Sequence, residues 1–483
     1  MINLIHKQKI NGLVLLFILS IFSFSCKKFV QVSTPPTAIG SSTVYANDLT
    51  AAAVLTGVYD RMMTNGNLAS GYQSISFLAG LTSDELTNYT SSSSFISDCY
   101  NNTLHSSSSY FWNEIFQRIY AANKAIEGLA GSTGVTPSEK QQLIGEAKFI
   151  RAFFHFYGTN LFGDFPLVTT TNYQVNNTIQ RSTQSLLYQQ IVSDLQDAQL
   201  ALSDNFLTPT GGVATTERVR PNKGAAASLL ARVYLYLKKW DSAEAQATSV
   251  INSPKNYKLV HNLDSVFLKN STEAIWQLQP VQTGYNTYDG YDFVLTSAPG
   301  STITPVALSP SILNAFDSGD NRAKRWIGSI TTGGRTYSYP YKYKIYTINN
   351  NQSSASEYLM VFRLAEQYLI RAEARAQQGN LQGAAADLNM IRNRAGLANT
   401  VDSASQANLL NAIYHERQVE LFTEWGHRWF DLKRTGNIAS VMTAVTPQKS
   451  KGNNSWNANW AVFPVPLSEI LLNGNLTQNT GYQ

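Results

Sequence analysis

The chain has 483 residues, a net charge of +5, and only 14% Asp, Glu, Lys and Arg. So sparse a charge provides no strong basic field for nucleic acid, and we expect no nucleic-acid partner. Tyr, Phe and Trp make up 11% of the residues, which favours neutral polar ligands such as sugars or peptides, although a place in the core is the favoured explanation for any single aromatic residue.

The first 25 residues are typical of a secretory signal peptide. Lys7 and Lys9 give it a basic start, and the apolar run 12–22 is shorter than the about 20 residues that span a bilayer. Small residues before Cys26 indicate lipoprotein processing, with lipid on the Cys26 thiol, although Ser23 stands where such sites prefer Leu. The alternative is an ordinary leader that contains Cys26. We expect residues 26–42 to form a polar tether.

Helical periodicity dominates two regions, 43–252 and 360–435, which we expect to form the scaffold of one domain, 43–483. The predicted helices are 47–63, 110–129, 138–161, 183–202, 222–237, 242–251, 361–378, 381–395 and 405–424.

An internal repeat joins the two regions. Small and large apolar residues follow Ala231 and Ala372 at the same spacing, which is the pattern of tetratricopeptide helix pairs. The first copy has Trp240, Ala243, Ala247 and Val250, and the second has Leu381, Ala384, Leu388 and Ile391. The alternative is two unrelated helical hairpins.

Residues 253–360 interrupt the helical pattern with Pro, Gly, Ser, Thr and Asn and with short strand-like runs such as 274–278. Tyrosines alternate along 337–343, which favours a buried strand face over a binding strip. Long irregular inserts are usually functional, so this insert is the first candidate for ligand contact.

The charged segment 417–434 resembles an active site only in its composition. Glu424 and Arg428 have the i,i+4 spacing of a helical ion pair. We therefore predict a scaffold helix with a buried stripe of Leu421, Trp425, Trp429 and Leu432.

No motif for metal binding, cofactor binding or nucleophilic catalysis occurs in the chain, so we expect no metal, no cofactor and no enzymatic activity. The pairs Asp84–Glu85 and Asp289–Asp292 could serve a cation or a glycosidase. Nothing in their sequence neighbourhood indicates perturbed pKa values, and we discount both roles.

Aromatic residues in loops are better candidates, because a flat ring covers the C–H face of a sugar while polar groups bind its hydroxyls. One eight-residue stretch holds three tyrosines and two aspartates, Trp326 follows two arginines, and Tyr89 lies in an earlier loop. The predicted ligand-binding residues are Tyr89, Tyr285, Tyr288, Asp289, Tyr291 and Trp326.

Several segments together resemble the SusD/RagB family of outer-membrane nutrient-binding lipoproteins. They are Cys26-Lys27-Lys28-Phe29, EAKFIRAFFHFYGTNLFGDFP at 146–166, LIRAEARAQQGNLQGAAADLNMIRNRAGL at 369–397, HERQVELFTEWGHRWFDLKR at 415–434, and the terminal stretch 461–479. Thr480 stands before Gly481, where the family often has proline.

The resemblance implies a mainly α fold of about four tetratricopeptide-like helix pairs, with the insert forming the ligand face. It implies a lipid-anchored, surface-exposed protein of the outer membrane that captures an oligosaccharide and delivers it to a SusC-like TonB-dependent β-barrel transporter. Oligopeptide capture of the RagB type, a surface hydrolase and a purely structural lid are the alternatives.

Overall fold

A computed structural model describes residues 41–90, 94–209, 212–253, 256–282, 284–300, 304–346, 355–400 and 404–482. The predicted signal peptide, Cys26 and the predicted tether up to residue 40 lie outside these ranges. The chain divides after Val44. The first unit contributes the short helix α2 (Ser41–Val44) to the described residues, and everything below concerns the second unit, Tyr45–Gln483.

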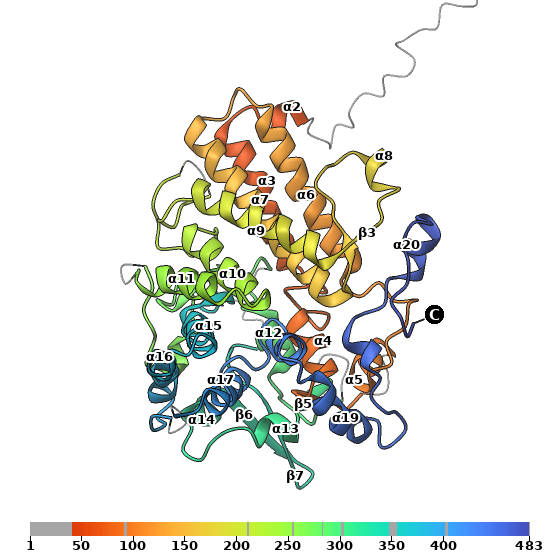
Figure 1. Ribbon diagram of the computed structural model, residues 1–483, viewed down its shortest axis with the longest axis vertical. Helices are drawn as coiled ribbons and strands as arrows, with labels where there is room; N and C mark the ends of the chain where they lie inside the picture. Colours follow the sequence, from red (N-terminus) through yellow and green to blue (C-terminus); the bar gives the residue numbers. More distant parts are fainter. Residues whose placement is uncertain are drawn as a thin grey trace, which may run out of the picture. The chain divides into compact units, whose positions relative to one another are not determined.

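The second unit is mainly helical, as predicted (Figure 1). Each predicted helix is present within a few residues of its expected ends, except that the last one stops at Glu420. Their bounds are α3 Asp48–Met62, α6 Trp112–Ala130, α7 Pro137–Phe162, α9 Gln184–Ala201, α10 Lys223–Tyr236, α11 Trp240–Ile251, α15 Leu364–Gln377, α16 Leu381–Arg394 and α17 Gln406–Glu420.

Polar side chains begin many of these helices. The Asn47, Thr183 and Asn222 side chains each accept a hydrogen bond from a backbone N–H in the first turn of the helix that follows. An N-cap of this kind satisfies a donor that has no partner inside the helix, and is worth about 1 kcal/mol.

The long helices pack in succession, α6 on α7, α7 on α9, α9 on α10, and α10 on α11. The series continues directly from α11 to α15, α16 and α17, although the whole insert separates α11 from α15 in the sequence. The two repeat copies are the pairs α10–α11 and α15–α16, and their small residues, including Ala231, Ala243 and Ala384, are fully buried. The predicted tetratricopeptide-like scaffold is therefore confirmed.

The insert is irregular, as predicted, and its strands are short. Strand β4 occupies the predicted range, Ala274–Leu278, and pairs with β8 at the start of the second repeat copy. The remaining described strands pair antiparallel in twos: β1 (Leu86–Asn88) with β5 (Val306–Leu308), β2 (Phe165–Pro166) with β3 (Arg181–Ser182), and β6 (Ile327–Thr332) with β7 (Arg335–Pro340). Strand β8 is Leu359–Arg363.

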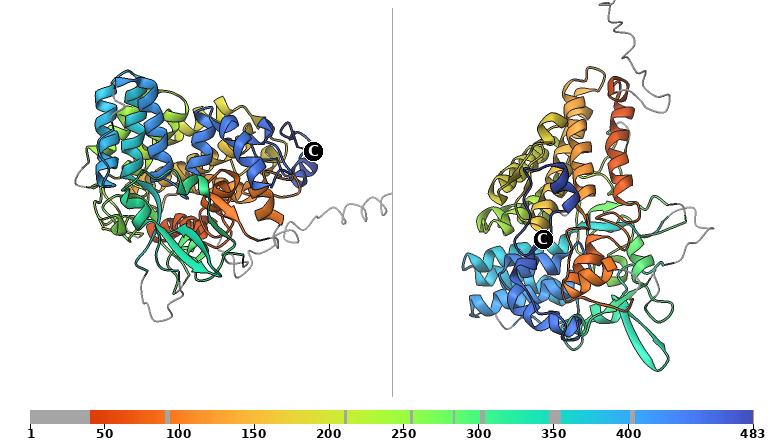
Figure 2. Two further views of the ribbon diagram at one scale, coloured as in Figure 1. Left: turned by 90° about the horizontal axis from the view of Figure 1, so that it is seen from below. Right: turned by 90° about the vertical axis from the view of Figure 1, so that its right-hand side faces the viewer.

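The β6–β7 hairpin projects away from the helices (Figure 2). Its two turn residues, Gly333 and Gly334, have φ values of 58° and 74°, a combination that glycine adopts at little steric cost. The predicted buried strand face at 337–343 is wrong for Tyr337, Tyr339 and Tyr341, which are only half-buried, whereas Tyr343, which follows the end of β7, is buried at 6% exposed. A two-stranded hairpin has no second layer to cover both of its faces.

The segment that follows α17 corrects a second prediction. The chain turns at Gly426, with φ of 70°, before α18 (His427–Arg434), so Glu424 and Arg428 do not share a helix. Glu424 instead binds Lys342 at 2.5 Å and Arg363 at 2.8 Å, and Arg428 binds Asp84 at 2.7 Å.

The predicted scaffold role of this segment nevertheless agrees with its burial. Leu421, Trp425, Trp429 and Leu432 are all at most 3% exposed. Nearby, the Glu420 carboxylate is surrounded by the guanidinium groups of Arg363, Arg394 and Arg322. These charges come from the insert and from the repeats, so the buried ion pairs join the two parts of the domain.

No helix in the described ranges combines the length and apolar composition needed to cross a bilayer.

Candidate functional site

Three tyrosines of the insert meet, as the prediction requires. The rings of Tyr285 and Tyr288 stack with centroids 5.8 Å apart, and Tyr291 meets them edge-on at 5.8 and 6.4 Å. Tyr288 and Tyr291 lie on α12 (Tyr288–Phe293), and Tyr285 lies just before it. We call these three residues the tyrosine cluster. Tyr285 and Tyr291 are half-buried, whereas Tyr288 is 8% exposed.

Several contacts fix the tyrosine cluster in place. Phe293 of α12 stacks on Phe77 of α4 (Ile75–Thr82), with ring centroids 5.5 Å apart. The side-chain oxygen of Asn286 accepts hydrogen bonds of 2.9 Å from the backbone N–H groups of Ser356 and Glu357. The cluster is thus held from both sides by elements distant in sequence, which pre-organises it for a ligand.

Asp289 and Asp292 lie on the inner side of α12. Asp289 is 6% exposed and, with Phe293, Lys342 and Tyr343, encloses a void of about 10 Å³, room for a single water. Burial and the nearby charge of Glu424 raise the pKa of Asp289 to about 7. The prediction that Asp289 contacts a ligand is therefore wrong, because its carboxyl group faces the interior.

Asp292 is buried as well, and one of its carboxyl oxygens has no hydrogen-bond partner. Burial and the charge of Asp289 raise the pKa of Asp292. The expectation of ordinary pKa values for this pair is therefore wrong. The sequence could not show it, because the desolvation comes from residues that only the fold brings near.

Asp84 and Glu85 are also buried, and Asp84 forms an ion pair. Arg428 donates two hydrogen bonds to Asp84, of 2.7 and 2.8 Å, and these lower the pKa of Asp84 although burial raises it. Burial and the charge of Asp84 raise the pKa of Glu85 to about 8, again against expectation. In the described part of the chain, no three His, Cys, Asp or Glu residues gather closely enough to hold a metal ion.

Tyr89 lies in a second aromatic group, apart from the tyrosine cluster. Its ring meets Tyr337 of the β6–β7 hairpin edge-on at 5.4 Å, and the Arg335 guanidinium lies 5.4 Å from its centroid. Sequence reasoning missed Arg335, and it assigned Tyr337 to a buried face. The signal available was the run of alternating tyrosines beside the Gly-Gly turn.

Trp326 is the remaining predicted ligand contact, and this prediction is wrong. Its side chain is 0% exposed, its ring N–H donates a 3.0 Å hydrogen bond to the Leu263 carbonyl, and Phe267 packs edge-on at 5.5 Å. Trp326 is therefore a core residue that no ligand reaches in this structure.

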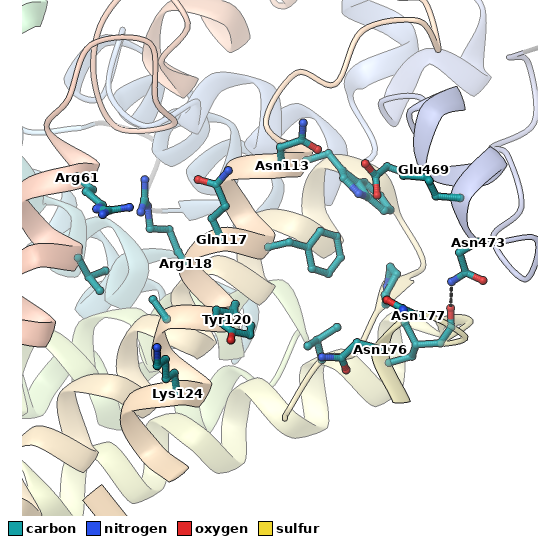
Figure 3. A pocket seen from close by; sticks show the side chains of 18 of the residues that line it. Arg61, Asn113, Gln117, Arg118, Tyr120, Lys124, Asn176, Asn177, Glu469 and Asn473 are labelled. Carbon is teal, nitrogen blue, oxygen red and sulfur yellow. Dashed lines mark hydrogen bonds between the residues drawn. The ribbon is translucent and has the colours of Figure 1, made fainter. Parts of the chain in front are cut away.

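A cleft of about 1060 Å³, which the sequence did not indicate, is seen from close by in Figure 3. Helices α3 and α6, which line it, lie in the part of the scaffold away from α15–α17 (Figure 1). Helices α3 and α6 form one wall. The segment after β2, the short helix α8 (Tyr173–Asn176) and the helix α20 (Leu467–Leu472) form the other. We call it the helical cleft. The sequence did not reveal this cleft, because polar residues at helical spacing show the same pattern whether they line a cleft or face solvent.

Comparison with known proteins agrees with this architecture. Residues 321–482 match the SusD family, and residues 42–235 match a family described as starch-binding and associating with the outer membrane. SusD-like protein P25 of Formosa agariphila is 24% identical over 99% of this chain and 100% of its own. The starch-binding protein SusD of Bacteroides thetaiotaomicron is 25% identical over 72% of this chain and 74% of its own.

Among solved structures, a laminarin-binding SusD-like protein superposes with a TM-score of 0.74 and 25% identity, covering 91% of this chain and all of the other. One family match covers most of the first scaffold region, and the other runs from the last part of the insert through the second scaffold region to residue 482. The structural match extends over nearly the whole chain. With the repeated helix pairs and the irregular insert, these findings show that the chain belongs to the SusD-like proteins.

Proposed function

We propose that the protein captures a neutral glycan and that the tyrosine cluster is its ligand platform. The observation that carries this proposal is the meeting of three tyrosine rings, two of them half-exposed, on a loop and helix that are fixed from both sides. A ring of this kind covers the C–H face of a sugar, and the phenolic hydroxyls bind its hydroxyl groups.

The names of two relatives support a glucan as the first ligand to test. One is described as binding starch and one as binding laminarin, and both of these are neutral polymers of glucose. Tyr89, Tyr337 and Arg335 supply a second patch of rings and hydrogen-bond donors, suited to a further part of a long chain.

Capture without catalysis is the mode of action that we propose. Asp84 is occupied by Arg428, and Asp289 and Asp292 point to the interior, so none of these carboxyl groups is placed to attack a bound sugar. We further propose that the protein is anchored in the outer membrane through lipid on Cys26 and hands its ligand to a SusC-like TonB-dependent transporter. The family description of outer-membrane association supports this placement.

The test is calorimetric titration of the full chain, in detergent, with laminarin and with soluble starch. The Tyr285→Ala/Tyr291→Ala double variant should bind the preferred glycan at least about tenfold more weakly, a loss of about 1.4 kcal/mol. Tyr173→Ala is the matched control, because Tyr173 is 68% exposed and lies outside the cluster. A glycan bound equally by both variants would show that the platform is elsewhere.

Two further outcomes would redirect the proposal. Binding of oligopeptides and of no glycan would favour the RagB-type alternative, and sustained release of shorter sugars would indicate a hydrolase. The anchor has its own test: labelled palmitate should appear on the wild-type chain and be lost in Cys26→Ser.

A further inference from the structure

The helical cleft is lined by one continuous face of α6. Asn113, Gln117, Tyr120 and Lys124 follow each other three or four residues apart, and Phe116 lies three residues after Asn113 and four before Tyr120, so the five side chains share one side of the helix. Tyr120 is 48% exposed, and Asn113 and Gln117 are exposed as well. An exposed ring between side-chain amides is an arrangement that suits a ligand with apolar faces and hydroxyl groups.

Three cations gather along one wall of this cleft. Arg61 comes from α3, and Arg118 and Lys124 come from α6. In Figure 3 the guanidinium groups of Arg61 and Arg118 lie next to each other. The positive charge of Arg61 helps lower the pKa of Arg118, after the larger effect of burial. Two like charges brought together without a shared anion cost free energy.

The neighbouring anions leave this charge largely unbalanced. Within the described residues neither Arg61 nor Lys124 has an ion-pair partner, and Arg118 has only Glu114, at 3.7 Å. Arg118 is 4% exposed, and its Nε has no hydrogen-bond partner. Among the described residues that line the cleft, Glu469 is the single acidic one, and it lies across the cleft on α20 (Figure 3).

Glu114 itself compensates Arg118 incompletely. It accepts a hydrogen bond from the backbone N–H of Leu68, and its other oxygen has no hydrogen-bond partner. Burial raises the pKa of Glu114 to about 7, although Leu68 and Arg118 lower it. The raised pKa weakens the negative charge that Glu114 offers, so the buried Arg118 guanidinium is incompletely neutralised.

We propose that the helical cleft is a second saccharide site, and that it takes a sugar bearing carboxylate or sulfate groups, with Arg61 and Lys124 binding the anionic groups, the charge of Arg118 lying beside them in the lining, and Tyr120 stacking on a ring. The volume of about 1060 Å³ is enough for several sugar units. The far wall is firm, because the Asn473 side chain donates a 2.8 Å hydrogen bond to the Ile179 carbonyl. This site is separate from the tyrosine cluster and does not depend on it.

The experiment is calorimetric titration of the full chain with three hexamers: oligogalacturonate, sulfated carrageenan and maltohexaose. We expect Arg61→Gln/Lys124→Gln to weaken at least one anionic hexamer at least about tenfold and to leave maltohexaose unchanged. Wild-type affinity for that hexamer should also fall between about 50 and about 500 mM NaCl. Comparing the two anionic hexamers tells carboxylate from sulfate.

Lys239→Gln/Lys258→Gln is the matched control, because it removes two exposed charges outside the cleft and should leave all three affinities unchanged. Tyr120→Ala should weaken the anionic hexamer, whereas Tyr285→Ala/Tyr291→Ala should not, which separates this site from the proposed neutral-glycan platform. Polyglutamate is titrated alongside the three hexamers. The proposal is overturned if neither anionic hexamer binds, if Arg61→Gln/Lys124→Gln binds them normally, or if polyglutamate is the only anionic ligand that binds.

Discussion

The guanidinium of Arg232 donates two hydrogen bonds to the carboxylate of Glu366, of 2.7 and 2.6 Å. Arg232 lies on α10 of the first repeat copy and Glu366 on α15 of the second, and both side chains are 2% exposed. The pair therefore joins the two copies directly, although the insert separates them in the sequence. The Phe362 ring, 4.8 Å from the Arg232 guanidinium, adds a cation–π contact.

Loss of one partner from this pair should destabilise the protein strongly. Arg232→Met leaves the Glu366 carboxylate buried without its bidentate donor, and such a change costs about 3–5 kcal/mol. The free energy of unfolding from urea titration measures the effect. Arg232→Met/Glu366→Leu should recover much of the loss, because it removes both charges.

A surface pair gives the matched control. Lys223 lies 3.4 Å from Asp204, and both side chains are well exposed, so Lys223→Met should cost less than about 1 kcal/mol. Equal effects for Lys223→Met and Arg232→Met would contradict the role assigned to the Arg232–Glu366 pair.

The helical scaffold could be predicted because its information is local. Apolar residues at helical spacing and small residues at matching offsets are visible without any knowledge of tertiary contacts. The break after α17 could not be read in this way, because the apolar pattern from Leu421 to Leu432 continues across it. Thr423, Trp425 and Gly426 all have positive φ there, and contacts with distant elements hold that turn. One such contact is the 3.2 Å hydrogen bond from the Thr423 N–H to Glu85.

The candidate site was predictable only in part for the same reason. Tyr285, Tyr288 and Tyr291 are close in sequence, and a short helix brings their rings together. The environment of Trp326 depends on Leu263 and Phe267, about sixty residues away, so the sequence could not tell a buried ring from an exposed one. The cations of the helical cleft come from two helices that are far apart in sequence, and their meeting is a property of the fold.

Gly290 should be essential to the position of the tyrosine cluster. A Cβ atom at this residue would lie 2.6 Å from the backbone carbonyl oxygen of Ile345, closer than non-bonded atoms approach. We expect Gly290→Ala to push α12 away from residue 345 and to weaken binding of the cognate glycan severalfold, without removing any ring. Titration of the variant with that glycan measures the effect.

Gly57→Ala is the matched control for this substitution. Gly57 is also helical, and nothing lies within 4 Å of an added Cβ there. This variant should bind the neutral glycan normally and gain up to about 1 kcal/mol of stability from the helix preference of Ala. Normal glycan binding by Gly290→Ala would argue against α12 as part of the platform.

The buried carboxyl group of Asp289 should make stability depend on pH. Its pKa is about 7 in the folded protein against 3.8 in the unfolded chain, so between these values the folded state binds more protons. The protonated Asp289 carboxyl group makes its full contribution to the free energy of unfolding below about pH 4, and this contribution is lost as the pH rises to about 7. Asp289→Asn has no titrating group at this position. Above pH 7 its free energy of unfolding should therefore exceed that of the wild type by up to about 4 kcal/mol.

Urea titrations at several pH values measure this difference. The gain in the free energy of unfolding should be near zero at pH 4, grow through pH 5 and 6, and level off above pH 7. Asp292 and Glu424 add negative charge near Asp289, and Lys342 opposes them. The pH at which the stability difference changes most steeply therefore reflects the titration of these groups together. A gain that stays constant across this range would exclude the burial of an ionised Asp289 as its cause.

Substitution of Trp326 should affect stability and leave ligand binding intact. Trp326→Phe keeps an aromatic ring in the core but loses the hydrogen bond to the Leu263 carbonyl and leaves a space beside Phe267. The expected cost is about 2–3 kcal/mol, from an unsatisfied buried carbonyl and a small cavity. Thermal unfolding measures this loss, and titration with the cognate glycan should give the wild-type affinity. A stable Trp326→Phe protein with weakened glycan binding would instead support the original prediction that Trp326 contacts the ligand.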